Sequence, residues 1–212
     1  MKVLYNWLKE FVDVKASPVD LRTRLSLAGI AIDALEDTAG GPLLDAEITA
    51  NRPDCLGHYG MAREVAAIYR LPVKPVAPQL KEAAEKASEL TRVTIESPDL
   101  CGRYTARMIR GVKIQPSPDW LRQRLLAIGQ NSINNVVDIT NYVMFELGQP
   151  LHAFDFDRLE EKRIVVRRAR TPPRSAVSMS GSSRSATRRL WGFRWSIGAA
   201  TSCFAPRARC PR

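Results

Sequence analysis

Residues 132–156 constrain the fold of this chain most, because they combine a helical pattern, a helix end and a histidine. One polar stripe is expected from side chains that lie four and three residues apart: Asn134, Asp138 and Asn141. A second stripe is apolar and can face a core: Val136, Ile139, Val143 and Leu147. Gly148 and Pro150 are typical of a helix end, so the segment predicts a helix over residues 135–147.

His152 follows the predicted helix end directly. A polar helix face next to a histidine is one way to build a binding pocket. A buried polar layer with a hydrogen-bonded core histidine is the alternative, because buried polar groups are usually paired. The residue types alone favour the second interpretation without excluding the first.

Helices and strands alternate in the pattern before residue 71, which indicates a small α+β domain. The expected helices cover residues 5–12, 18–27 and 59–69, and the expected strands cover residues 30–35 and 43–49. A connector with three prolines follows at Leu71–Gln79. The elements expected beyond it are a short polar helix at 81–90, strands at 92–96, 103–113 and 163–168, and a helix at 118–128 with Ser117 as its N-cap and Pro118 as its first residue. The predicted fold class is therefore α+β.

The formal net charge of +10 is concentrated in the last 42 residues, which contain eight arginines and no Lys, Asp or Glu. Residues 1–170 hold 24 basic and 22 acidic side chains, and this net of +2 gives no support for a nucleic-acid surface. Residues 171–212 lack a sustained helix or strand period. They are either a disordered arginine-rich tail that binds nucleic acid or an out-of-frame translation of a GC-rich gene. Trp191 and Trp195 favour the second interpretation, since tryptophan is unusual in a solvated tail.

The four cysteines are scattered, and none forms a C-x-x-C pair. Cys55 and His58 form a C-x-x-H half-site, but the chain has only one further histidine, so no metal site is expected. No signal peptide and no membrane-length apolar segment is apparent, which predicts a soluble, cytoplasmic protein in a reducing compartment. P-loop, G-x-G-x-x-G and G-x-S-x-G patterns are also lacking, so neither a bound nucleotide nor a covalent serine nucleophile is expected.

Five segments resemble the bacterial phenylalanyl-tRNA synthetase beta subunit and occur in the order of that family. They are YNWLKEFVD (Tyr5–Asp13), NRPDCLGHYGMAREVAAIY (Asn51–Tyr69), RYTARMIRGVKI (Arg103–Ile114), PSPDWLRQRLLAIG (Pro116–Gly129) and NNVVDITNYVMFELGQPLHAFD (Asn134–Asp155). Several long motifs in order are far more specific than a single short pattern. The resemblance covers residues 1–170 and ends where the composition changes.

The resemblance implies four parts of the chain. These are an N-terminal scaffold domain at 1–71, a proline-rich linker with a short helix at 72–90, an incomplete B3/B4 editing and tRNA-binding domain at 91–170, and an aberrant, disordered tail at 171–212. Many beta subunits insert an OB-fold between the positions of Glu36 and Asp45, where this chain has only a short turn. The implied fold is a small α/β scaffold followed by an incomplete mixed α/β domain.

The editing module of this family hydrolyses tyrosyl-tRNA(Phe), and the residues that match its pocket are Thr140, Asn141 and His152. A histidine can orient or deprotonate water, and Asn and Thr can fix the water or the substrate amine. The family's glutamate that reads the tyrosine hydroxyl would fall in residues 171–212, which contain no glutamate.

The partners that the resemblance implies are tRNA(Phe) and the alpha subunit. No association with a membrane is expected. The aminoacylation site, with its ATP and Mg²⁺, belongs to the full synthetase, so no cofactor is expected in this chain.

Three functions are open at this point: a truncated beta subunit with editing activity, a free-standing RNA-binding B3/B4-type module without catalysis, and the non-functional product of a damaged gene. The arginines that can contact tRNA phosphates, or form a solvated face instead, are Arg103, Arg107 and Arg110. Residues 51–54, Asn-Arg-Pro-Asp, are expected to cap a helix and to pair arginine with acid. Trp7 and Trp120 are expected to be core anchors.

Overall fold

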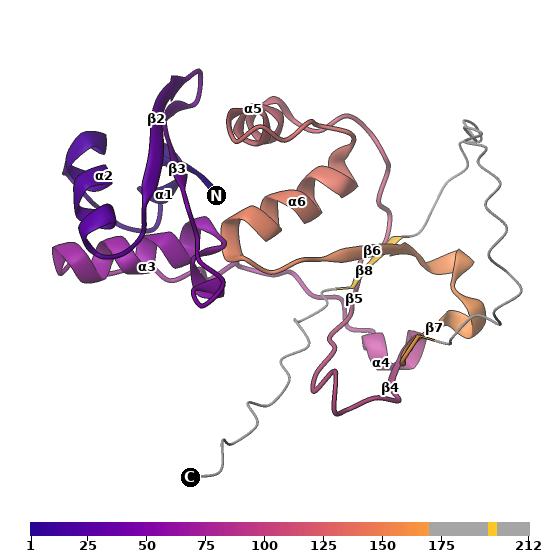
Figure 1. Cartoon of the computed structure of the whole chain (residues 1–212). Helices are drawn as coiled ribbons and strands as arrows, with labels where there is room; N and C mark the ends of the chain where they lie inside the picture. Colours follow the sequence, from indigo (N-terminus) through magenta and orange to yellow (C-terminus); the bar gives the residue numbers. More distant parts are fainter. Residues whose placement is uncertain (170–194, 199–212) are drawn as a thin grey trace, which may run out of the picture.

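A three-stranded antiparallel sheet and three helices form the N-terminal part of the chain (Figure 1). The computed structural model describes residues 1–169 and 195–198, the last four by their backbone. The elements up to residue 69 are β1 Lys2–Leu4, α1 Tyr5–Leu8, α2 Pro18–Leu27, β2 Ile32–Thr38, β3 Gly41–Ala46, the 3-10 helix η1 Pro53–Cys55 and α3 His58–Tyr69. The strands pair in the order β1-β3-β2, and residues 39–40 form the short turn between β2 and β3.

Two smaller sheets and two longer helices follow. Their elements are α4 Ala87–Leu90, β4 Arg92–Ile95, β5 Arg107–Met108, α5 Asp119–Ala127, α6 Asn135–Leu147, β6 His152–Asp155, η2 Phe156–Arg158, η3 Glu160–Lys162, β7 Arg163–Val166 and β8 Trp195–Gly198. Strands β4 and β7 are parallel, whereas β8 lies between β5 and β6 and is antiparallel to both. β8 lies in the segment for which no sustained helix or strand period was found. The sequence did not predict this strand, because four residues are too few to show a period and both neighbouring strands are distant in sequence.

One hydrophobic core joins the N-terminal part to α5 and α6. The buried side chains that α5 and the residue after it contribute to this core are Leu121, Leu125 and Ile128. Helix α6 packs Tyr142 and Phe145 against the same core, and Tyr142 stacks on the buried Trp7 with 4.7 Å between ring centroids. Figure 1 shows α5 and α6 beside the N-terminal part, with the β4–β7 sheet at the other end of the molecule. The core therefore fixes α6, which carries Thr140 and Asn141.

The predicted α+β class is confirmed, and the longer helices lie where the sequence placed them. Their ends follow from local chemistry. Ser17 accepts a hydrogen bond from the backbone N–H of Asp20 at 3.1 Å and so caps α2. Gly148, with a φ of 73°, ends α6 in the left-handed conformation that glycine adopts without strain. None of the helices in residues 1–169 is long and apolar enough to cross a membrane.

Several elements are shorter than the sequence predicted. The strand expected over residues 103–113 is reduced to β5, because it pairs only with the short β8 and because Gly111, at a φ of 72°, ends the extended backbone. The helix expected over residues 81–90 is reduced to α4, which buries no side chain that could hold a longer helix. Strand β1 was not predicted at all, since three residues show no alternation.

Two predictions about burial were wrong. Trp120 is 57% exposed and is not a core anchor, whereas Trp7 is fully buried as expected. The apolar stripe predicted for α6 does not face the core, because Ile139 and Leu147 are 43% and 42% exposed. The face with Tyr142 packs inward instead, since an aromatic ring buries more surface and stacks on the indole.

Candidate functional site

The first polar residue of the predicted stripe is the N-cap of α6. The side-chain oxygen of Asn134 accepts hydrogen bonds from the backbone N–H groups of Val136 at 3.1 Å and Val137 at 3.0 Å. These are two of the N–H groups that the first turn of a helix leaves without an intrahelical partner. Asn134 is therefore structural.

Asp138, the second residue of the stripe, holds the loop before α6. Its carboxylate is fully buried and accepts hydrogen bonds from the hydroxyls of Ser117 and Ser132, both at 2.5 Å, and from the backbone N–H of Ile133 at 2.9 Å. Ser117 was expected to cap α5, which is wrong, because its hydroxyl donates to this carboxylate instead. Burial raises the pKa of Asp138, but hydrogen bonds from Ser117, Ser132 and the backbone of Ile133 and Asn134 outweigh burial and leave the pKa below its ordinary value. The buried polar layer is therefore an ionised structural carboxylate.

The residues assigned to an editing pocket lie on α6 and β6. Thr140 and Asn141 are half-buried neighbours on α6, so their side chains point about 100° apart around the helix axis. The Thr140 hydroxyl donates a hydrogen bond to the carbonyl of Val137 at 2.7 Å. His152 is exposed at the start of β6, with its ring 6.3 Å from the ring of Phe154.

Two of these three side chains keep polar groups available. Asn141 and His152 have no side-chain hydrogen-bond partner among residues 1–169, whereas the Thr140 proton is used within its own helix. The alternative interpretation, that His152 is a buried core histidine, is wrong because this side chain is exposed. The assignment of the three residues to one pocket stays a prediction.

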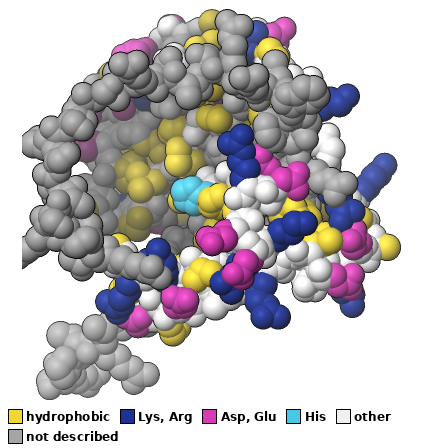
Figure 2. Space-filling model, turned by 90° about the vertical axis from the view of Figure 1, so that its right-hand side faces the viewer, with side chains coloured by type: hydrophobic (Ala, Val, Ile, Leu, Met, Phe, Trp, Pro, Cys, Tyr) yellow, Lys and Arg dark blue, Asp and Glu magenta, His cyan; other side chains and the backbone are white. Residues whose placement is uncertain are grey.

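The arginines proposed for tRNA phosphates are mostly paired with acids. Arg107 pairs with Glu82 at 3.0 Å and Arg110 pairs with Glu85 at 2.6 Å, while Arg103 is exposed. Figure 2 shows basic and acidic side chains interspersed on the face in view. Each pair partly neutralises its arginine, so these side chains do not add up to a basic stripe. Their contact with tRNA stays a prediction.

Four side chains gather at the start of α3, around Arg52. Nη2 of Arg52 lies 2.9 Å from Asp54 and 2.5 Å from Glu64, and it donates a hydrogen bond to Cys55 Sγ at 3.2 Å. The pairing of arginine with acid is thus confirmed. The expected capping is wrong, because the N-cap of α3 is Gly57 and no side chain caps it.

The same cluster has the ligand types of a metal site but not its charge balance. Asp54, Cys55 and Glu64 place their ligand atoms within 4.8 Å of one another. The guanidinium of Arg52 already supplies the positive charge between them, and it lowers the pKa of Asp54 to about 2. Burial, and then the charge of Asp54, raise the pKa of the Cys55 thiol to about 11, which keeps this sulfur protonated and a poor ligand. The cluster is suited to hold the arginine rather than a metal ion.

His58, which the sequence presented only as half of a C-x-x-H pair, joins three segments of the core. Its Nε2 accepts a hydrogen bond from the backbone N–H of Leu4 at 3.0 Å, and its Nδ1 donates to the carbonyl of Phe145 at 2.8 Å. Its ring stacks on Trp7 with 3.9 Å between centroids. One nitrogen accepts and the other donates, so the ring is neutral and both of its nitrogens are used. Its position at the start of an apolar helix was the signal that it would be buried.

The free energy of unfolding is expected to fall in mild acid because of His58. Burial lowers the pKa of His58 from 6.5 to about 4, an effect that the Phe145 carbonyl opposes and Arg124 reinforces. This stability is present above pH 6.5 and is lost as the pH falls from 6.5 towards 4, because only the unfolded chain takes up the proton there. The expected loss is about 3 kcal/mol.

Urea unfolding between about pH 7 and pH 4.5 measures this loss. A His58→Gln variant is the control, since it is less stable at neutral pH but lacks the titrating ring. Its stability should depend less steeply on pH over this interval. An equal slope in the two proteins would show that His58 does not cause the acid sensitivity.

Comparisons of the sequence with known proteins point to one family. The B3/4 domain family matches residues 100–184. The phenylalanine–tRNA ligase beta subunit of Rhodopirellula baltica is 47% identical over 167 residues, which are 79% of this chain and 24% of that subunit. The phenylalanine–tRNA ligase beta subunit of Syntrophotalea carbinolica is 56% identical over 122 residues, which are 58% of this chain and 15% of that subunit.

A solved structure from the same family also aligns with the chain. It is the crystal structure of an N-terminal fragment of the phenylalanyl-tRNA synthetase beta subunit from Pyrococcus horikoshii. The alignment covers 76% of this chain and 43% of the Pyrococcus chain, at 16% identity and a TM-score of 0.37. The sequence relatives are decisive, although the chain spans about a quarter or less of their length. Identity near one half over 167 residues identifies the chain as homologous to phenylalanine–tRNA ligase beta subunits, with a B3/4 domain match at residues 100–184.

Proposed function

We propose that the chain is part of a phenylalanine–tRNA ligase beta subunit whose B3/4 region binds tRNA(Phe) and hydrolyses tyrosyl-tRNA(Phe). The observation that carries the proposal is its 47% identity with such a subunit over 167 residues, together with the B3/4 match at residues 100–184. The chain covers 24% of that relative, so ligation, with its ATP and Mg²⁺, is proposed for an assembly with the alpha subunit and not for this chain.

The side chains on α6 and β6 suit ester hydrolysis without a covalent intermediate. Breaking an aminoacyl ester requires a positioned water and donors for the oxyanion that develops on the carbonyl. The exposed imidazole of His152 can accept a proton from that water. The Asn141 amide, which has no partner among residues 1–169, can donate to the oxyanion or hold the substrate amine. The Thr140 hydroxyl already donates to Val137, so it can only accept from a ligand.

Tyrosine release from tyrosyl-tRNA(Phe) tests the proposal on the purified chain. We expect His152→Ala to slow release by about 100-fold, which is the lower end of the range for losing a general base. Asn141→Ala should slow it by about 100-fold if its amide is an oxyanion donor. Asn131→Ala, which alters an exposed amide before α6, is the matched control and should leave the rate unchanged.

Equal rates for the parent chain, His152→Ala and Asn141→Ala would contradict the proposed roles. Phenylalanyl-tRNA(Phe) is the second substrate in this experiment. Residues 171–212 contain no glutamate to pair with a tyrosine hydroxyl, so the two esters are expected to be hydrolysed at similar rates.

The other two functions that the sequence left open gain no support from the described residues. A free-standing RNA-binding module needs cations for phosphates, and Arg107 and Arg110 are engaged with Glu82 and Glu85. Steeply salt-dependent tRNA binding without hydrolysis would favour that module. The absence of both tRNA binding and hydrolysis would favour the product of a damaged gene.

A further inference from the structure

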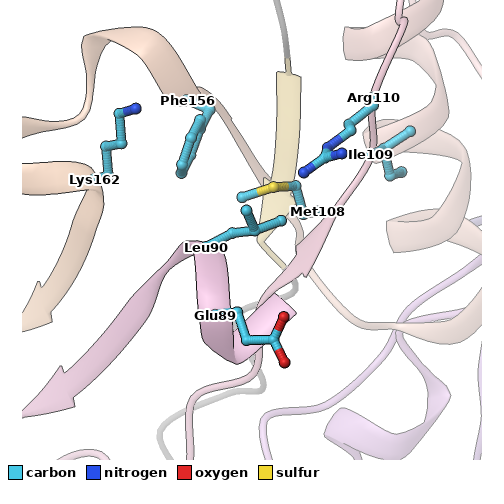
Figure 3. A pocket seen from close by; sticks show the side chains of 7 residues that line it. All are labelled: Glu89, Leu90, Met108, Ile109, Arg110, Phe156 and Lys162. Carbon is cyan, nitrogen blue, oxygen red and sulfur yellow. The ribbon is translucent and has the colours of Figure 1, made fainter. Parts of the chain in front are cut away.

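A cavity of about 330 Å³ lies between α4, β5 and the two 3-10 helices η2 and η3, and its lining does not include Thr140, Asn141 or His152. Its volume is at the small end of the range of about 300–1,000 Å³ that is common for ligand pockets. The side chains that line it are Glu89, Leu90, Met108, Ile109, Arg110, Phe156 and Lys162. Figure 3 shows Leu90, Met108 and Phe156 around its interior, and these side chains form an apolar part of the wall.

Two cations flank this apolar wall on opposite sides. The guanidinium of Arg110 is directed towards Met108 and the interior in Figure 3, while the Glu89 carboxylate is directed away. Arg110 pairs with Glu85 at 2.6 Å, which leaves other N–H groups of its planar fork for a ligand. Lys162 lies across the cavity with its ammonium 5.4 Å from the ring centroid of Phe156.

The ammonium of Lys162 has no carboxylate partner among residues 1–169, so nothing described there neutralises it. Arg110 is partly neutralised by Glu85, so Lys162 is the main cation that the cavity offers to a ligand. A ligand that enters it should carry a negative group and an apolar body.

Lys162 is held in place by strained backbone. Glu161 and Lys162 have φ angles of 50° and 52°, in the left-handed region that residues other than glycine rarely adopt. The Thr91 hydroxyl donates to the Lys162 carbonyl at 2.7 Å, and the Lys162 N–H donates to the carbonyl of Leu159 at 3.0 Å. Such strain persists only where its surroundings impose it, and it is frequent at ligand sites.

We propose that this cavity is a second binding site, for a small monoanion with a compact apolar body of the aryl or branched carboxylate type. Lys162 would hold the carboxylate, and Leu90, Met108 and Phe156 would cover the apolar body. A charge-assisted hydrogen bond is about twice as strong as a neutral one, so the anionic group should dominate recognition. The site is independent of ester hydrolysis at His152, and failure of either proposal leaves the other unaffected.

Calorimetric titration of the full chain with three probes tests the site. Phenylacetate has both features, phenylacetamide lacks the charge, and acetate lacks the apolar body. We expect phenylacetate to bind most tightly and Lys162→Met, which removes the charge but retains the length, to weaken it by about tenfold. Lys81→Met changes an exposed lysine outside the cavity and should leave the affinity unchanged.

Three results would overturn the proposal. They are no detectable binding of phenylacetate, equal affinity for phenylacetate and phenylacetamide, and unchanged affinity in Lys162→Met. Met108→Trp decides the case where Lys162→Met does not fold, because the larger side chain fills the cavity from β5. Unchanged phenylacetate affinity in Met108→Trp would equally exclude the site.

Discussion

Gly60→Ala is expected to destabilise the protein by about 3 kcal/mol or more, the upper range for overpacking a filled site. Helix propensity alone predicts the opposite, because alanine in a helix interior is favoured over glycine by about 1 kcal/mol. A Cβ atom at Gly60 would lie 1.8 Å from the carbonyl oxygen of Asp54 and 2.9 Å from its carbonyl carbon. These are backbone atoms of η1 and cannot rotate away, so α3 would have to move and break the hydrogen bonds of His58.

Urea unfolding at neutral pH measures this loss, with Ala67→Gly as the matched control. Ala67 is exposed on the same helix, so its replacement should cost only the propensity difference of about 1 kcal/mol. A Gly60→Ala protein as stable as the parent chain would show that η1 does not pack against α3 as the structure has it.

Asp138→Ala is expected to destabilise the protein by about 3 kcal/mol or more, because several polar groups lose a charged acceptor at once. The groups left without it are the hydroxyls of Ser117 and Ser132 and the backbone N–H of Ile133. These groups hold the loop that leads into α6 and the residues before α5. The loss should therefore affect both helices and, through them, the core that they share with the N-terminal part.

The control for Asp138 is Ile139→Ala on the same helix. Ile139 is 43% exposed, so its truncation should cost less than about 1 kcal/mol. The pKa of Asp138 is lowered in the folded chain, so its stabilising effect is present above pH 3.8 and is lost as the pH falls below that value. Equal stability of Asp138→Ala and Ile139→Ala would contradict a structural role for the buried carboxylate.

The helices could be predicted from the sequence because their signals are local. Ser17 and Gly148 are typical helix-end residues, and each acts as such in the structure. Strands β1 and β8 could not be predicted, since each is at most four residues long and depends on partners far away in the sequence. The partner of β1 is β3, whose residues lie about 40 positions later.

The candidate site was predictable only in part, for the same physical reason. The spacing placed Asn134, Asp138 and Asn141 on one stripe. It could not show which of these side chains are hydrogen-bonded within the fold and which can bind a ligand. That distinction depends on Ser117 and Ser132, which reach Asp138 from outside the helix. Position and resemblance singled out Asn141, while the geometry leaves its amide unpaired among residues 1–169.

The shared core has a consequence for the order in which the chain can fold during synthesis. Side chains of α5 and α6, among them Leu121, Leu125 and Phe145, complete a core to which residues before position 74 contribute most of the side chains. His58 stays without an acceptor for its Nδ1 proton until Phe145 is present. A ribosome must therefore translate at least twice the length of the N-terminal part before that part can close. Until then, the nascent chain exposes an apolar surface of the kind that chaperones bind.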